Sequence, residues 1–225
     1  MTCAFESLFQ PIVDTAGHRI LAHQCDAGEG IDVAIGAAAR QSAGGLYFIN
    51  SWILNPCFRS ILDAVSGSGL PPSNLVFEVA ETAIAEDPGH WREVCEWYRR
   101  NGFGIALAHA GGRLRDGGPH SLRTSLALRP DYIKLEKTLV RDIEKKPNAV
   151  MIRNLADLAE DFEISIVADG VERHRTVENL WLLNVYIMQG SLFGRPAPGI
   201  LHSHSTDLAN LAQAVGYEPV AASSR

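Results

Sequence analysis

Several apolar runs of this sequence end in a residue whose side chain can bind a ligand, hold a metal ion or move a proton. These residues are Gln24, Asn50, Glu78, His109 (preceded by Ala108), Lys134, Asp169 and Gln189. A convergent cluster of polar side chains is the default candidate for a binding or catalytic site. If the runs are neighbouring parallel strands, the side chains meet at one end of a sheet. The pattern indicates a functional site; the alternative is that each residue caps a helix or satisfies backbone groups.

The apolar runs alternate with longer amphipathic segments. Two strands, 8–13 and 19–25, flank a turn that contains Gly17, which predicts an antiparallel hairpin. From Ile31 onward helices and strands alternate, which is typical of parallel strands covered by helices. The expected strands are 46–50, 75–79, 104–107, 132–135, 164–167 and 186–188. The expected helices are 31–41, 55–65, 88–100, 121–127, 148–161, 175–183 and 206–215.

One hairpin and the six later strands make eight, which predicts an α/β fold of the TIM-like (β/α)8 barrel type with an antiparallel first strand pair. An open doubly wound sheet is the alternative, but no GxGxxG follows the first strand. We expect residues 1–200 to form the barrel and residues 201–225 to form a C-terminal helix and a polar tail.

The composition excludes several classes of protein. Apolar residues make up 46% and charged residues 20%, which excludes a disordered chain. The net charge of −6 argues against binding to nucleic acid or to an anionic membrane surface. The four cysteines form no CxxC pair, which favours reduced thiols. No signal peptide or membrane span is evident, so we expect a cytoplasmic protein.

Six short segments resemble the EAL domain family, bacterial phosphodiesterases that cleave the second messenger cyclic di-GMP. Residues 9–13 (FQPIV), 48–50 (FIN) and 75–82 (LVFEVAET) resemble its opening, its third-strand Asn and its E-x-T-E segment. Residues 129–134 (RPDYIK), 168–172 (ADGVE) and 189–196 (QGSLFGRP) resemble its PDxxK, AEGVE and QGxxFGRP segments. The resemblance extends from Phe9 to about Pro198 and implies a role in cyclic di-GMP signalling.

The resemblance also implies a site for two divalent cations. Its positions in this chain are Gln24, Asn50, Glu78, Ala108, His109 and Asp169. The EAL triplet reads Gln24-Cys25-Asp26, and the family's Asp-Asp pair reads Ala108-His109. A neutral amide and a methyl group thus stand where carboxylates are needed. We therefore expect no metal, no cofactor and no phosphodiesterase activity, so that the chain is not an enzyme.

Two segments also differ in length from the family. The stretch between Gln24 and Asn50, which links the second and third strands, is shortened and leaves room for one helix. The loop over residues 110–118 is lengthened and carries Arg113 and Arg115. Glu81, which anchors this loop in the family, is present.

These features favour a catalytically inactive regulatory module that acts through protein–protein contacts, and a homodimer is one form of such contact. One alternative is a non-hydrolytic cyclic di-GMP receptor. Its candidate ligand-binding residues are Gln10, Lys134, Gln189, Arg113 and Arg115. The weakest alternative is an active metal-dependent phosphodiesterase.

The retained polar residues can also be explained by structural roles that involve no ligand. Lys134 would then form a buried salt bridge with Glu78 or Asp169. A metal site built from Glu78, His109 and Asp169 is a further alternative.

A protein partner could dock on the aromatic helix 88–100, which carries Trp91, Trp97 and Tyr98. The alternative is that Trp91, Cys95 and Tyr98 pack inward at helical spacing.

Overall fold

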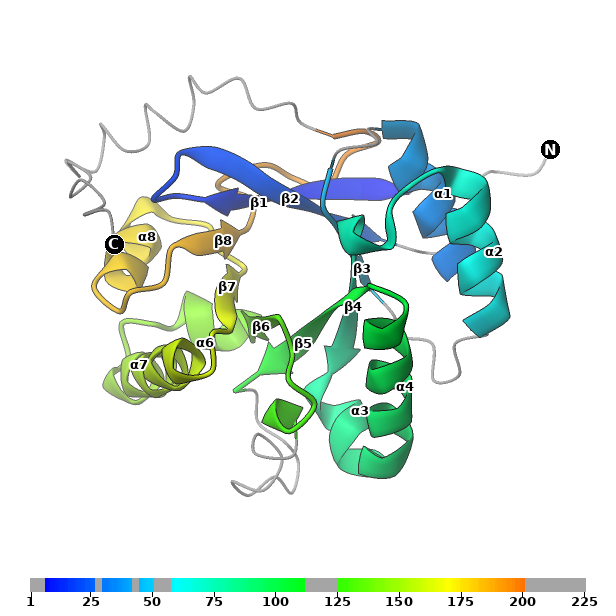
Figure 1. The fold of residues 1–225 in the computed structure, drawn as a ribbon. Coiled ribbons are helices and arrows are strands. Elements are labelled where there is room, and N and C mark those ends of the chain that lie inside the picture. Colours follow the sequence, from blue (N-terminus) through cyan, green and yellow to red (C-terminus); the bar gives the residue numbers. More distant parts are fainter. Residues whose placement is uncertain (1–6, 27–29, 42–44, 51–57, 112–124, 201–225) are drawn as a thin grey trace, which may run out of the picture.

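The computed structural model describes residues 7–26, 30–41, 45–50, 58–111 and 125–200. Within them the strands form a closed barrel in the order β1 to β8. Figure 1 shows the strands as a ring with the helices around the outside. Neighbouring strands from β2 to β8 are parallel, whereas β1 runs antiparallel to both β2 and β8. The predicted barrel with an antiparallel first pair is confirmed.

The strands differ from the predictions mainly at their ends. Their bounds are β1 Leu8–Asp14, β2 Arg19–Asp26, β3 Tyr47–Asn50, β4 Leu75–Ala80, β5 Gly104–Ala110, β6 Tyr132–Leu135, β7 Ser165–Asp169 and β8 Ile187–Gln189. β5 continues three residues beyond the predicted end, so Ala108 and His109 lie within the strand rather than after it.

The helices lie outside the ring. Their bounds are α1 Ile31–Gln41, α2 Phe58–Ser68, α3 Glu81–Glu86, α4 Pro88–Arg100, α6 Lys137–Arg141, α7 Lys146–Asp161 and α8 His174–Trp181, with a 3-10 turn η1 at Pro72–Asn74. The short helices α3 and α6 were not predicted, because one or two turns carry too little hydrophobic periodicity to be recognised. The predicted helix at 206–215 and most of that at 121–127 lie outside the described residues.

The start of α4 shows how local sequence sets a helix boundary. The Asp87 side chain accepts a hydrogen bond from the backbone N–H of His90 at 3.0 Å, and Pro88 occupies the first turn. An aspartate cap and a proline at this place satisfy or remove backbone donors that the helix leaves unpaired. The helix therefore begins at Pro88, as the predicted range 88–100 has it.

Alternate side chains of each strand face the barrel interior, and this alternation places the polar residues. A small interior core contains Ile12, Ala22, Phe48, Val76, Ala106 and Val167, with Tyr132 and Ile187 packed against it. Side chains two positions apart on a strand share a face. On each strand, the next residue on this inner face lies closer to one end of the barrel. These residues are Gln10 of β1, Gln24 of β2, Asn50 of β3, Glu78 of β4, Ala108 of β5, Lys134 of β6, Asp169 of β7 and Gln189 of β8. We call this end of the barrel the mouth.

The opposite faces of the strands pack against the helices in the main core. Phe77 of β4 stacks on Tyr98 of α4 with ring centroids 4.4 Å apart, and both rings are buried. Trp91 and Cys95 of α4 are also buried, so this face of the helix belongs to the core. Within the described part of the chain, no helix is both long and apolar enough to span a membrane.

Candidate functional site

Lys134 of β6 is the central cation of the mouth. Its side chain is almost fully buried, and its Nζ lies 2.6 Å from Glu78 Oε1 and 2.8 Å from Gln24 Oε1. Asp169 Oδ2 lies 4.0 Å from the same nitrogen. A buried ammonium needs an opposite charge and hydrogen-bond acceptors to offset its lost hydration. The salt bridge expected for Lys134 is therefore present and joins β6 to β4, while the hydrogen bond to Gln24 joins β6 to β2.

Three glutamines continue this network toward β1 and β8. Gln189 Nε2 donates to Gln24 Oε1 at 2.6 Å and to Gln10 Oε1 at 2.9 Å. Gln10 Nε2 in turn donates to the backbone carbonyl of Gly194 at 2.9 Å. The strand pairing favours these contacts, because Gln10 and Gln24 lie directly opposite each other on β1 and β2. The structure thus brings together Gln10, Gln24, Glu78, Lys134 and Gln189.

The chain around Gln189 can reach this geometry only with a glycine after it. A Cβ atom placed on Gly190 would lie 2.0 Å from the carbonyl oxygen of Val171. The backbone N–H of Val171 donates to the carbonyl of Gln189, which ties the end of β8 to the segment after β7. The glycine therefore allows two backbone segments to approach closely.

Asp169 ends β7 at the edge of the network. Its carboxylate lies 3.7 Å from Nζ of the exposed Lys137 as well as 4.0 Å from Lys134. It is buried, and it pairs in register with Gln189 on β8. Asn50 ends β3 directly opposite Glu78 in register. Both residues lie at the mouth, as the sequence predicted.

The β5 side of the mouth has a different construction. Ala108 takes the position that faces the interior, so this strand contributes a methyl group there. The next residue, His109, has a φ of 60°, and the β5–β6 register shifts between Leu107 and Ala110. His109 Nδ1 lies 2.9 Å from Glu136 Oε2. Sequence reasoning missed Glu136, although its position just after β6 could have indicated it.

Glu81 anchors the chain that follows β5. Its buried carboxylate accepts a hydrogen bond from the backbone N–H of Gly111 at 3.3 Å. Arg113 and Arg115, predicted as ligand-binding residues, lie outside the described residues.

The side chains of the mouth do not fit a pair of hard divalent cations. Such ions bind several carboxylate oxygens, but the Glu78 carboxylate is paired with the Lys134 ammonium and Gln24 offers an amide. Across the described ranges, no three His, Cys, Asp or Glu side chains are grouped so that they could hold a metal ion. This finding does not support the alternative metal site at Glu78, His109 and Asp169.

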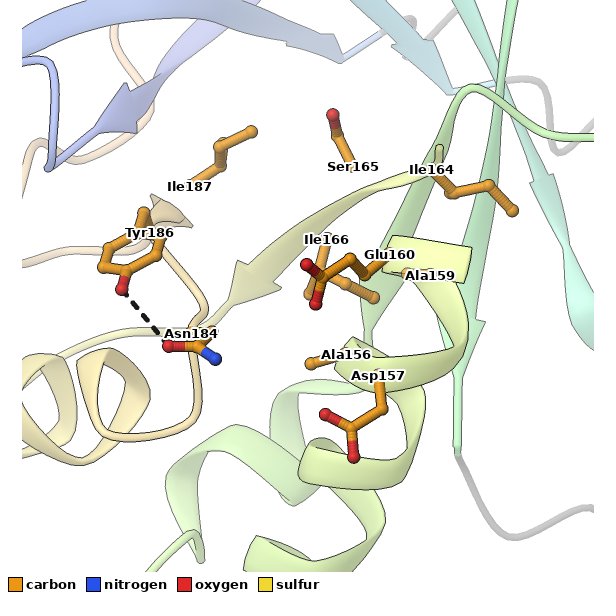
Figure 2. A pocket seen from close by; sticks show the side chains of 10 residues that line it. All are labelled: Ala156, Asp157, Ala159, Glu160, Ile164, Ser165, Ile166, Asn184, Tyr186 and Ile187. Carbon is orange, nitrogen blue, oxygen red and sulfur yellow. Dashed lines mark hydrogen bonds between the residues drawn. The ribbon is translucent and has the colours of Figure 1, made fainter. Parts of the chain in front are cut away.

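A pocket of about 410 Å³ lies at the other end of the barrel. Figure 2 shows it between α7 and the first residues of β7 and β8, with Asp157 and Glu160 on the helix side. Tyr186 donates a hydrogen bond to Asn184 Oδ1 at 3.3 Å within its wall. None of the polar residues of the mouth lines this pocket.

The aromatic helix α4 is mainly a packing element. Trp97, the proposed docking residue, stacks on Phe58 of α2 with ring centroids 4.4 Å apart. It is partly buried against the main core. The inward-packing alternative for Trp91, Cys95 and Tyr98 is confirmed, and the aromatic content of α4 is explained without a partner.

The chain is similar to known proteins of one family. The model of the EAL domain family matches residues 49–196. The cyclic di-GMP phosphodiesterase RocR of Pseudomonas aeruginosa is 33% identical over 130 residues, which are 57% of this chain and 32% of RocR. The uncharacterized protein Rv1354c of Mycobacterium tuberculosis is 29% identical over 64% of this chain and 22% of its own length. This chain therefore spans at most about a third of these relatives.

Solved structures show the same fold. A calcium and cyclic di-GMP complex of Klebsiella pneumoniae BlrP1 superposes with a TM-score of 0.77 at 24% identity, covering 87% of this chain and 56% of that one. A standalone EAL protein of Vibrio cholerae with bound cyclic di-GMP gives a TM-score of 0.76 at 22% identity, covering 92% and 98%.

The comparisons contradict one prediction from the sequence. The replaced carboxylates led us to expect that the chain is not an enzyme. The matched family and the phosphodiesterases among the relatives point instead to an enzyme. The prediction was wrong because it weighed a few substituted positions above the family as a whole.

Proposed function

The chain belongs to the EAL domain family, and from this premise we propose that it binds cyclic di-GMP at the mouth of its barrel. Relatives named as cyclic di-GMP phosphodiesterases and solved structures that contain this dinucleotide support the choice of ligand. The proposed role is that of a domain in bacterial cyclic di-GMP signalling.

One observation carries the proposal. Lys134, Glu78 and Gln189 are buried together at the carboxyl ends of the parallel strands, where barrels of this type bind their ligands. Burying polar and charged side chains is unfavourable unless they are hydrogen-bonded to one another. A connected polar network of this kind, set above an apolar interior, is characteristic of a binding site.

Calorimetric titration of the protein with cyclic di-GMP tests the proposal. We expect binding with a dissociation constant in the micromolar range or tighter, and chromatography of the same samples shows whether the dinucleotide is hydrolysed. The variant Lys134→Met should abolish binding. Lys145→Met removes an exposed lysine that pairs with Asp142 and is the matched control.

The wild-type protein keeps the test decisive if Lys134→Met does not fold. Absence of heat in the wild-type titration at high ligand concentration, with no thermal shift, would contradict the proposal. If folded Lys134→Met and Lys145→Met bind cyclic di-GMP equally well, the ligand binds outside the mouth.

We also propose, as a second function, regulation through contact with another protein or a second copy of this chain. Exposed apolar side chains on α7 support it, since Val150 and Met151 are 48% and 44% exposed. Light scattering of the wild type and of Met151→Glu tests this proposal for a second copy. We expect a dimer that the substitution dissociates, and a monomer in both samples would contradict that form of the proposal.

A further inference from the structure

The amide oxygen of Gln24 is shared by two donors. It accepts from Lys134 Nζ at 2.8 Å and from Gln189 Nε2 at 2.6 Å. The two contacts join strands β2, β6 and β8 through one atom. Both donors are buried, with Lys134 at 3% and Gln189 at 1% exposure.

The direction of the hydrogen bonds is determined from both ends of the network. Lys134 can only donate, so Gln24 must turn its oxygen toward it. The backbone carbonyl of Gly194 can only accept, so Gln10 must turn its nitrogen toward Gly194 and its oxygen toward Gln189. Gln189 therefore faces two oxygens and must present its nitrogen to both.

This arrangement leaves a specific acceptor at Gln189. Its Nε2 uses both hydrogens in the bonds to Gln10 and Gln24. Its Oε1 is buried and has no hydrogen-bond partner in the described part of the chain. An unpaired buried oxygen is unfavourable, so the site is completed by a group that donates a hydrogen bond.

We propose that Gln24 is a positioning residue of the mouth. Its oxygen fixes the Lys134 ammonium and the orientation of the Gln189 amide, so that Gln189 presents an acceptor to an O–H or N–H group of the ligand. Cyclic di-GMP offers such donors on its bases and ribose hydroxyls. The inference rests on the proposed function for the identity of this ligand.

Two substitutions at Gln24 distinguish the effect of its hydrogen-bond acceptor from the effect of its side-chain size. Gln24→Met keeps a side chain of similar length but removes the acceptor. Gln24→Glu keeps an oxygen that can accept both hydrogen bonds. Gln41→Met is the matched control, since Gln41 Oε1 accepts from the backbone N–H of Ile200 outside the mouth.

The first measurement is the side-chain amide signal of Gln189 in ¹⁵N-glutamine-labelled protein without ligand. In the wild type we expect slow hydrogen exchange, because both amide hydrogens are bonded and buried. Gln24→Met should shift this signal and accelerate exchange, Gln24→Glu should restore slow exchange, and Gln41→Met should leave both unchanged. A purely packing role for Gln24 would leave the Gln189 signal and its exchange rate unchanged in Gln24→Met, whose side chain has a similar length.

The second measurement is the affinity for cyclic di-GMP. We expect Gln24→Met to weaken binding about tenfold or more, since it frees two buried donors, and Gln41→Met to bind like the wild type. If the wild type binds no cyclic di-GMP, the proposed function fails while the amide signals still test Gln24. Fast Gln189 exchange in the wild type, or unchanged exchange and affinity in Gln24→Met, would overturn the inference itself.

Discussion

On the β1, β2 and β8 side of the mouth, half-buried hydrogen bonds join Gln10, Gln189 and Gln24 to Lys134. On the β5 side, His109 Nδ1 lies 2.9 Å from Glu136 Oε2, and these side chains are 36% and 23% exposed. The first side tolerates little change, because its side chains hold one another in place through linked hydrogen bonds. The second side is accessible to water, which weakens the contact between His109 and Glu136. The mouth therefore has a rigid side at β1, β2 and β8, where substitutions should be costly, and a β5 side where substitutions should cost less.

The largest effect is expected from a substitution of Lys134, the cation on the rigid side of the mouth. Lys134→Met removes the ammonium that pairs with the buried Glu78 carboxylate, and we expect a loss of about 3–5 kcal/mol in the free energy of unfolding. Lys145→Met, in an exposed pair with Asp142, should cause a much smaller loss, because water screens that pair. Urea denaturation measures both. Equal losses in the two variants would remove the distinction between buried and exposed pairs.

A second substitution changes the backbone that holds Gln189. Gly190→Ala brings a methyl group against the Val171 backbone, so we expect a loss of about 2–3 kcal/mol. Gly67→Ala in α2, where an added Cβ meets nothing within 4 Å, should instead stabilise by about 0.5–1 kcal/mol. Thermal unfolding of both variants should therefore give shifts of opposite sign. A stable Gly190→Ala would mean that the approach to Val171 is relaxed in solution.

A third test uses pH on the outer face of β2. Burial raises the pKa of the Cys25 thiol to about 12, from an ordinary value of 9.0. Between these values the folded state holds a proton that the unfolded state has lost, so stability falls as the pH rises. The slope approaches about 1.4 kcal/mol per pH unit for one thiol.

Urea unfolding at several pH values between 9 and 11 measures that slope. Cys25→Ala should be less stable than the wild type at pH 8, because the hydrogen bond from Sγ to the Ala34 carbonyl is lost. Its decline above pH 9 should be shallower. Parallel declines in both proteins would show that another group is responsible.

The smallest effect is expected on the β5 side. His109→Ala and His109→Gly both remove the pair with Glu136, but only glycine adopts a φ of 60° without strain. We expect the glycine variant to be more stable than the alanine variant by about 1 kcal/mol, measured by thermal unfolding. If the alanine variant is the more stable of the two, the backbone at residue 109 is not strained.

The sequence predicted the strands and the mouth because both depend on short-range patterns. Apolar runs that end in Glu78, Lys134 and Asp169 indicate where parallel strands stop, and barrel closure then brings these ends together. The salt bridge of Lys134 followed from the requirement that a buried ammonium be paired. These predictions needed no knowledge of the exact register.

Other features depend on register and backbone geometry that no local pattern carries. The positive φ of His109 and the register shift beside it turn this residue toward Glu136, and neither is visible in the residue types. The shared oxygen of Gln24 needs β1, β2 and β8 to be aligned within one residue. The aromatic content of α4 left both a docking surface and inward packing open, and only the structure shows Phe77 stacked on Tyr98 and Phe58 stacked on Trp97.

The closing strand of the barrel also bears on how the protein is synthesised. β1 pairs with β8, and the hydrogen bond between Gln10 and Gln189 spans 179 positions of the chain. A ribosome completes β1 early, so this strand must wait for β8 before both of its edges are paired. Contacts of such long sequence separation form slowly. The rigid side of the mouth is therefore assembled last, after translation of nearly the whole barrel, and a nascent chain that stops before Ile187 lacks it.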